Sequence, residues 1–234
     1  MTVPQLPLAL PYPPDQRFEN FIGAPAGAVP QLRAMAAGTS TDWVYLSGPS
    51  GTGKTHLSLA LCAAAEQAGR APAYLPLAAA RGRLRDALEA LEDRDVVALD
   101  GLEAVTGGRE DEVALFDFHN RARSNRITLL YTARATPDAV GVVLPDLRSR
   151  LSQCSRIALV PLELDQRRMV LRERAQRRGL VLDEPSVEWL LARAGQDSGR
   201  LVALLDRLDR ESMAAKRRIT VPFLKRVIDS LDAG

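Results

Sequence analysis

A glycine-rich octapeptide has the spacing of a phosphate-binding loop. It reads Gly48-Pro49-Ser50-Gly51-Thr52-Gly53-Lys54-Thr55 and matches G-x-x-x-x-G-K-[ST] at every fixed position. An expected strand over 43–47 precedes it and an expected helix over 56–68 follows it, which is the context that this motif requires. Glycines let backbone N–H groups surround phosphate oxygens, and the start of a helix adds partial positive charge. The octapeptide therefore predicts a site for nucleotide phosphates.

Two side chains of this loop and one downstream carboxylate complete the expected chemistry. Lys54 is expected to reach the β-phosphate, and the γ-phosphate where one is present, while the Thr55 hydroxyl is expected to ligate Mg²⁺. The apolar run 95–99 ends in Asp100, which places a carboxylate at the carboxyl edge of a parallel sheet, where it can hold the Mg²⁺ directly or through water. Gly101 follows, where a strong ATPase usually carries a second acid. We therefore expect nucleotide binding with slow hydrolysis.

The remaining pattern predicts an α/β domain followed by helices. Strands and helices are expected to alternate from residue 29 to residue 160, which is typical of a parallel sheet with helices on both faces. The expected strands are 43–47, 73–76, 95–100, 127–132 and 155–159, and the expected helices are 29–37, 56–68, 83–91 and 113–125. After Pro161 the pattern is helical, over 166–178, 185–194, 198–213 and 221–231. The predicted division is an extended tail over 1–16, the α/β domain over 17–160 and a helical domain over 161–234.

Composition and charge restrict the class of protein. Hydrophobic residues make up 46% of the 234 residues and charged residues 26%, close to globular averages, which excludes a disordered or fibrous protein. No apolar stretch approaches the ~18 residues of a membrane span, and the N-terminus lacks the basic segment of a signal peptide, so we expect a cytoplasmic protein with no membrane partner. Two cysteines are too few for a disulfide framework or a zinc site. The net charge of +2 gives no strong attraction to nucleic acid.

Further motifs follow the phosphate loop in a fixed order. A polar strand end is expected at Thr132, an arginine pair lies in Leu147–Leu151 before the last strand, and Arg200 lies early in a helix of the helical domain. With the phosphate loop and Asp100, this order resembles the AAA+ family. The resemblance implies an AAA+ α/β P-loop domain with a parallel sheet, followed by a small all-helical lid domain. Arg134 stands where relatives usually have an aspartate, so the role of that sensor position stays open.

Four segments narrow the resemblance. Phe18-Glu19-Asn20-Phe21-Ile22 and Leu147–Leu151 are similar to the bacterial replication initiators of the DnaA family, a similarity that covers roughly residues 17–232. The sequence ends at Gly234, so we expect no helix-turn-helix domain for reading DNA. The tail segment 5–10 and the segment 217–225 resemble the Hda family, the DnaA-related regulatory inactivators of the initiator.

The resemblance implies roles for individual residues. Phe21 and Ile22 are expected to contact the bound nucleotide, which is ADP or ATP with Mg²⁺. Arg200 is expected to fold over its phosphates. Arg150 is expected to be an arginine finger that reaches the γ-phosphate on another protein, since a planar guanidinium matches the charge on the transferring phosphoryl oxygens. Arg148, two residues away, is the second choice for this role.

The tail is expected to bind the DNA sliding clamp, the beta subunit of DNA polymerase III. In this resemblance a glutamine hydrogen-bonds in a polar pocket of the clamp and leucines fill a hydrophobic one; the residues concerned are Gln5, Leu6, Leu8 and Leu10. Ala9 stands where the pattern has proline or a larger residue, which implies a modest affinity. The alternative is that the leucines fold back onto the domain.

Purely structural interpretations stand beside these roles. Arg150 could form an ordinary ion pair, and Arg200 could cap a helix. The basic run over 167–178 is expected to be a solvated helix face rather than a DNA contact. His56 and His119 have no metal-ligand spacing and are interpreted as structural.

The expected function is that of a nucleotide-bound AAA+ regulator with weak intrinsic ATPase activity. By resemblance, it docks on the clamp and stimulates ATP hydrolysis by the replication initiator DnaA, which prevents re-initiation of chromosome replication. The alternatives are a helicase loader, or another initiator-related AAA+ ATPase acting on DNA, and a small-molecule kinase, which four C-terminal helices disfavour. A homo-oligomer stays open, and direct DNA contact is expected to be weak or indirect.

Overall fold

Five parallel strands form one sheet. In the computed structural model the strand order is β2-β3-β4-β1-β5, and each neighbouring pair is parallel. The strands are β1 (Val44–Ser47), β2 (Pro72–Pro76), β3 (Val96–Asp100), β4 (Thr128–Ala133) and β5 (Ser155–Ala158). The structure describes residues 12, 13 and 15–195, and beyond them residues 201, 204, 208, 221, 222, 224 and 225.

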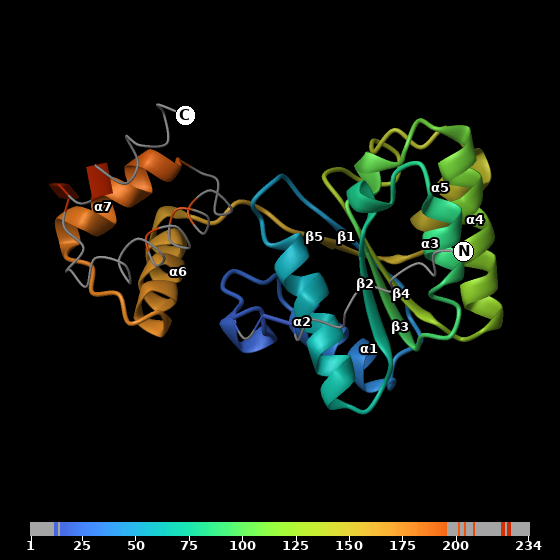
Figure 1. Ribbon diagram of the computed structural model, residues 1–234, viewed down its shortest axis with the longest axis horizontal. Helices are drawn as coiled ribbons and strands as arrows, with labels where there is room; N and C mark the ends of the chain where they lie inside the picture. Colours follow the sequence, from blue (N-terminus) through green and yellow to red (C-terminus); the bar gives the residue numbers. More distant parts are fainter. Residues whose placement is uncertain are drawn as a thin grey trace, which may run out of the picture.

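Helices cover both faces of the sheet (Figure 1). One face carries α1 (Ala28–Ala37) and α2 (Lys54–Gln67), and the other carries α3 (Leu84–Glu89), α4 (Arg109–Ser124) and α5 (Pro145–Ser152). Short 3-10 helices lie at Phe18–Asn20, Leu77–Ala80 and Leu102–Ala104. These elements confirm the expected α/β class with a parallel sheet.

Side chains of β3 alternate between two apolar cores. Val96 and Ala98 pack with α1 and α2, while Val97 and Leu99 pack with α3, α4 and α5. All four are fully buried. A strand that is covered on both faces reads as a continuous apolar run, which is why the run before Asp100 predicted a buried strand.

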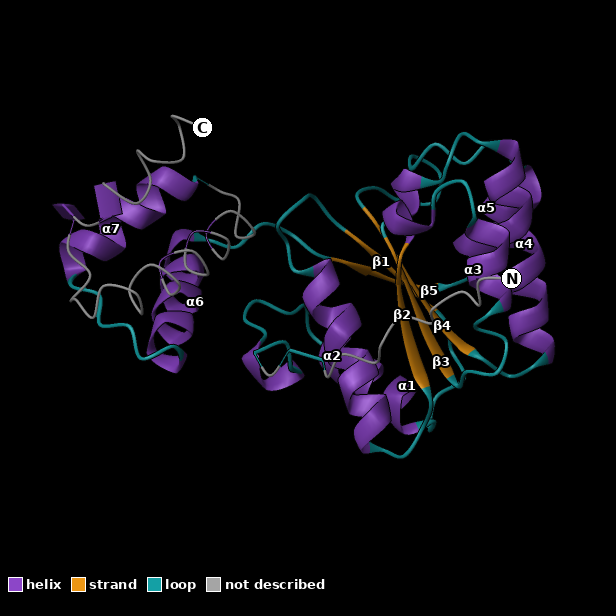
Figure 2. Ribbon diagram, in the orientation of Figure 1, coloured by secondary structure: helices purple, strands orange, loops and turns teal. Residues whose placement is uncertain are grey.

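A third apolar core belongs to the helical part of the chain, drawn apart from the sheet in Figure 2. It is built on α6 (Leu164–Arg177) and α7 (Glu184–Ala194). The Asp183 side chain caps α7 by accepting the Ser186 N–H at 2.9 Å. Among the described residues, no helix is both long enough and apolar enough to span a bilayer.

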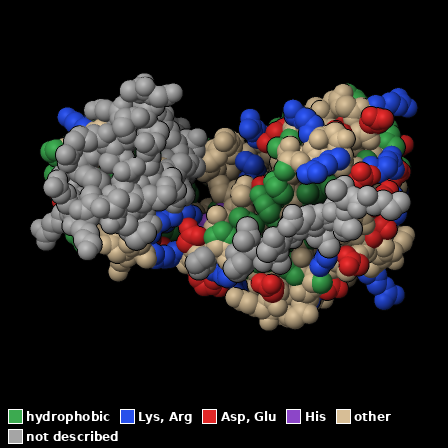
Figure 3. All heavy atoms as spheres, in the orientation of Figure 1, with side chains coloured by type: hydrophobic (Ala, Val, Ile, Leu, Met, Phe, Trp, Pro, Cys, Tyr) green, Lys and Arg blue, Asp and Glu red, His purple; other side chains and the backbone are tan. Residues whose placement is uncertain are grey.

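The basic run on α6 is largely ion-paired. Arg168 and Arg172 both contact the Glu184 carboxylate, and Arg174 pairs with Asp15 at 3.2 Å. Figure 3 shows basic and acidic side chains intermixed over the α/β part on the face it presents. These pairs favour the interpretation of the run as a structural helix face.

Helix α5 was not expected from the sequence, and α4 begins one turn before its expected start at residue 113. Only Leu147 and Leu151 of α5 are buried, and two apolar residues in eight give too little periodicity to predict a helix. In α4 the first turn is acidic, with Glu110, Asp111 and Glu112, and shows no apolar pattern.

A buried carboxylate on α4 holds the segment that leads into α5. Glu112 is fully buried, and its oxygens accept the backbone N–H groups of Gly107 at 2.8 Å, Val143 at 3.0 Å and Leu144 at 2.6 Å. Leu144 is the N-cap of α5. A buried charge is tolerated only when such hydrogen bonds satisfy it, so Glu112 fixes where α5 begins.

We predict that Glu112→Ala lowers the free energy of unfolding by about 3 kcal/mol, because three backbone donors lose their acceptor. Urea denaturation followed by circular dichroism measures this loss. Glu110→Ala is the matched control, since that neighbour is exposed, and should change stability by less than about 0.5 kcal/mol. Equal stability of the two variants would contradict the anchoring role of Glu112.

Candidate functional site

The phosphate-loop motif connects the end of β1 to the start of α2. A Cβ atom at Gly48 would lie 2.5 Å from the carbonyl oxygen of Leu159, and one at Gly53 would lie 2.5 Å from the Phe21 ring. Gly53 also has a φ of 94°, in the left-handed region that favours glycine. Both glycines are therefore required by the close approach of the surrounding chain.

Lys54 points into the loop. Its Nζ donates to the carbonyl oxygens of Gly48 at 2.6 Å and Pro49 at 2.8 Å. Burial lowers the pKa of Lys54, and the nearby Glu103 and Asp100 carboxylates oppose that shift. An anion would stabilise this desolvated ammonium more than neutral carbonyls do, because opposite charges attract strongly where water is excluded.

The Asp100 carboxylate receives three hydroxyl groups. Thr55 Oγ1 donates to Oδ2 at 2.7 Å, Tyr74 donates its phenol to the same oxygen at 2.9 Å, and Thr132 donates to Oδ1 at 2.5 Å. Burial raises the pKa of Tyr74, so its hydroxyl remains a donor. The structure thus brings together Thr55 and Asp100, the two oxygen ligands expected for Mg²⁺.

The strand end next to Asp100 carries an ion pair. Arg134 Nε lies 3.0 Å from Glu103 Oε1, and the Arg134 backbone N–H donates to Oε2 of the same carboxylate at 3.2 Å. The Gly101 N–H donates to Thr132 Oγ1 at 2.9 Å. Arg134, whose role the sequence left open, is therefore the ion-pair partner of the acid nearest to Asp100 in the sequence.

The N-terminal segment, the loop helix and α6 meet at His56. The Phe21 ring packs edge-on against the His56 imidazole with centroids 5.2 Å apart, while Ile22 is half-buried. His56 Nε2 lies 2.8 Å from the Arg17 carbonyl oxygen, and Nδ1 lies 3.3 Å from Arg174 of α6. Burial lowers the pKa of His56, so the neutral ring donates through Nε2 and accepts at Nδ1.

The predicted finger lies elsewhere. Arg150 is on α5 and lines a cavity with Thr128 and Ser155, the first residues of β4 and β5. The phosphate loop follows the last residue of β1, so Arg150 and the loop lie at opposite edges of the sheet. Arg148 is exposed on the same helix and does not line that cavity. Gln5, Leu6, Leu8, Leu10 and Arg200 lie outside the described residues.

Sequence reasoning missed two residues that shape these sites. Tyr74 contacts Asp100 from 26 positions away, and Glu112 anchors the start of α5 across 32 positions. A tyrosine in a short strand and a glutamate in an acidic helix turn are common, so neither stands out without the tertiary fold.

Comparisons with known proteins agree with this geometry. Residues 14–134 match the family of IstB-like ATP binding proteins, and residues 165–228 match the lid domain of Hda. Domain III of the Thermotoga maritima replication initiation protein DnaA has the same fold, with a TM-score of 0.78 at 17% identity over 94% of this chain and 98% of that one. The chain belongs to the family of IstB-like ATP binding proteins, is Hda-like in its lid and has the fold of DnaA domain III.

Two further relatives extend the comparison. An uncharacterized protein of Haemophilus influenzae is 35% identical over 227 residues, which cover 96% of this Hda-like chain and 98% of that protein. AMPPCP-bound DnaA from Aquifex aeolicus has a TM-score of 0.67 at 18% identity, over 84% of this chain and 66% of that one. The Hda-like protein thus shares its AAA+ fold with a DnaA structure that holds a nucleotide analogue.

Tyr74→Phe is predicted to weaken Mg²⁺-dependent ADP binding by about tenfold, because Asp100 loses one of its three hydroxyl donors and a hydrogen bond to a charged group contributes about 1.5 kcal/mol. ADP titration calorimetry with and without Mg²⁺ measures this. Tyr45→Phe is the matched control, since it removes a phenol that donates to the Ala135 carbonyl at 2.9 Å. An unchanged Mg²⁺ effect in Tyr74→Phe would show that the phenol does not position Asp100.

Proposed function

We propose that this Hda-like protein binds ADP or ATP at Gly48–Thr55 and acts on a second nucleotide held by DnaA. The observation that carries the proposal is the placement of two kinds of group at opposite sheet edges. The phosphate loop with Asp100 lies at the carboxyl edge, and Arg150 lies at the amino edge. One edge is suited to the protein's own ligand and the other to a ligand of its partner.

The residues of the loop fit a nucleotide with Mg²⁺. The close approaches at Gly48 and Gly53 leave room only for backbone, and the Lys54 ammonium is buried in the loop. In the proposal Lys54 binds phosphate oxygens, while Thr55 and Asp100 hold the metal ion, with Phe21 and Ile22 beside the nucleotide. Mg²⁺, when bound, neutralises charge on the phosphates.

Slow turnover of the protein's own nucleotide follows from the residues beside Asp100. Gly101 has no side chain that could orient an attacking water. Glu103 is the next acid along the chain, and Arg134 engages both of its oxygens. The bound nucleotide then acts mainly as a structural ligand, which stabilises the folded state by mass action.

Arg150 is proposed to act in trans. Because the loop lies at the other edge of the sheet, the Arg150 guanidinium serves a nucleotide outside its own chain. Within the described structure its side chain makes no hydrogen bond or ion pair, which argues against a purely structural role. A guanidinium so placed can neutralise charge that develops on a transferring phosphoryl group.

The remaining parts of the proposal rest on the sequence. Gln5, Leu6, Leu8 and Leu10 are proposed to bind the DNA sliding clamp, and Arg200 to contact the bound nucleotide from the lid. We further propose that stimulation of DnaA prevents re-initiation of replication in the cytoplasm. Direct DNA contact is secondary in this proposal, because the net charge is only +2.

Arg150→Ala is expected to lower stimulation of DnaA ATP hydrolysis by about 10³-fold, the lower end of what an arginine finger contributes. Phosphate release by DnaA, measured with DNA-loaded clamp, reports the loss. Arg148→Ala is the control on the same helix and should stimulate like wild type. Arg150→Lys should restore little, because an ammonium lacks the planar fork.

Two outcomes would count against this assignment. Loss of stimulation in Arg148→Ala alone would identify the other arginine as the finger. Full stimulation of DnaA by both Arg148→Ala and Arg150→Ala would contradict the trans mechanism. DNA unwinding or helicase loading by this protein would instead favour an initiator-related ATPase that acts on DNA.

Gln5→Ala combined with Leu6→Ala is expected to abolish clamp binding, because the pair supplies both the amide and a leucine of the tail motif. Surface plasmon resonance on immobilised clamp measures the affinity. ADP affinity should stay unchanged, as the tail precedes the phosphate loop by about 40 residues of sequence. Wild-type clamp affinity in the double variant would refute the tail assignment.

A further inference from the structure

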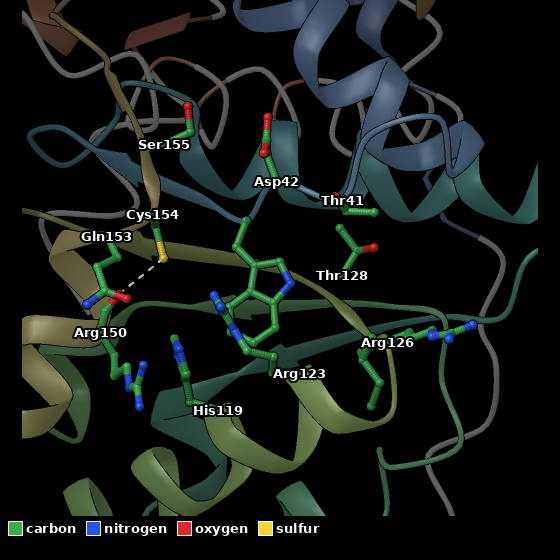
Figure 4. A pocket seen from close by; sticks show the side chains of 12 residues that line it. Thr41, Asp42, His119, Arg123, Arg126, Thr128, Arg150, Gln153, Cys154 and Ser155 are labelled. Carbon is green, nitrogen blue, oxygen red and sulfur yellow. Dashed lines mark hydrogen bonds between the residues drawn. The ribbon is translucent and has the colours of Figure 1, made fainter.

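A cavity of about 680 Å³ lies at the amino edge of the sheet, away from the phosphate loop. Trp43 precedes β1, Arg123 lies on α4 and Arg150 lies on α5, and all three line it. Figure 4 shows the Arg150 and Arg123 side chains ending on either side of His119, while Arg126 extends away.

The guanidinium groups of Arg123 and Arg150 are not neutralised in the part of the chain that the structure describes. Arg150 makes no side-chain hydrogen bond or ion pair there, and Arg123 only lies over the Trp43 ring, 5.2 Å from its centroid. Asp42 is the single acid among the lining residues, and it pairs with neither arginine. Two like charges facing one cavity repel, and an anion between them removes that repulsion.

His119 adds a polar group to the same wall. The ring is 1% exposed; Nδ1 lies 3.1 Å from the Tyr131 hydroxyl, and Nε2 has no hydrogen-bond partner among the described residues. Burial, together with Arg123 and Arg150, lowers the pKa of His119 to about 4. The imidazole is therefore neutral at pH 7 and adds no third positive charge. The Trp43 ring packs edge-on against it at 4.4 Å.

We propose that Arg123 and Arg150 together form an anion-binding site for a phosphate group, which belongs to the nucleotide bound by the partner protein. This inference rests on the proposed trans role of Arg150 and assigns it a second arginine. A terminal phosphate offers three oxygens and more negative charge than a carboxylate, so it is the better match for two guanidinium forks.

The surroundings favour a compact polyphosphate over a nucleic-acid backbone. A nucleic-acid backbone needs an extended basic stripe, whereas the basic residues that line this cavity are three arginines beside one acid, Asp42. The cavity instead gathers its positive charge at one place. Arg123 is exposed, and its one described side-chain contact is the Trp43 ring.

Trp43 provides a direct readout. The chain has two tryptophans, Trp43 and Trp189, so Trp189→Phe leaves the cavity tryptophan as the sole indole. Lys54→Ala in the same protein removes binding at its own phosphate loop. Inorganic tripolyphosphate is the probe: when it draws Arg123 off the ring, the Trp43 fluorescence changes, and the change saturates with probe concentration.

The expected result is that Arg123→Gln and Arg150→Gln each weaken tripolyphosphate binding at least tenfold in this background. Arg148→Gln is the matched control on α5 and should bind like the parent. Citrate and single-stranded oligo(dT) serve as carboxylate and nucleic-acid probes at equal concentration. Any of three results would overturn the proposal. The Trp43 fluorescence would show no saturable change, Arg123→Gln would bind tripolyphosphate as tightly as the parent, or citrate or oligo(dT) would bind more tightly than tripolyphosphate.

A second measurement separates this site from the proposed function. In the otherwise wild-type protein, Arg123→Gln should lower stimulation of DnaA ATP hydrolysis about tenfold while clamp binding is unchanged. If tripolyphosphate binding depends on both arginines but neither affects DnaA, the phosphate site stands and its assignment to the nucleotide of DnaA fails. If Arg150→Ala abolishes stimulation and Arg123→Gln does not affect it, the trans mechanism stands and the two-arginine site is wrong.

Discussion

A parallel sheet has two unlike edges, and the placement of the functional residues follows from that constraint. Every strand here runs in the same direction, so β1 and β3 deliver the phosphate loop and Asp100 to one edge. The segments that enter β4 and β5 lie at the other edge, with Arg150 among them. Because helices bury both faces, the edges are where polar chemistry is exposed. Two sites that both attract anions can therefore exist at opposite edges of one domain without competing.

Each edge depends on one carboxylate that is satisfied by neutral donors. Asp100 receives the hydroxyls of Thr55, Tyr74 and Thr132, and Glu112 receives backbone N–H groups from the chain that enters α5. An acid held in this way keeps its position without an arginine or lysine partner. The cations of the two edges, Lys54 and Arg150, thus remain available for phosphate, rather than being consumed by structural ion pairs.

The phosphate loop, Asp100 and the strand–helix alternation could be predicted from the sequence, because they depend on local spacing and on the burial of consecutive residues. Helix α5 could not be predicted, because Leu147 and Leu151 alone give no periodic signal. The partners of His56 and His119 could not be predicted either. Those partners come from other elements: Arg174 of α6 reaches His56 across 118 positions, and Tyr131 of β4 faces His119. Such contacts are set by packing, and a single sequence does not encode them in any short pattern.

The contacts of His56 link helix α6 of the lid to the phosphate loop. His56 lies in the first turn of α2, directly after Thr55, and its two ring nitrogens face the Arg17 carbonyl and the Arg174 guanidinium. Arg174 also pairs with Asp15, so the N-terminal segment, the loop helix and α6 share one chain of polar contacts. A movement of α6 must then stretch these contacts or carry the loop helix with it. Since buried polar contacts are costly to leave unmade, the position of the lid and the geometry of the phosphate loop are coupled energetically.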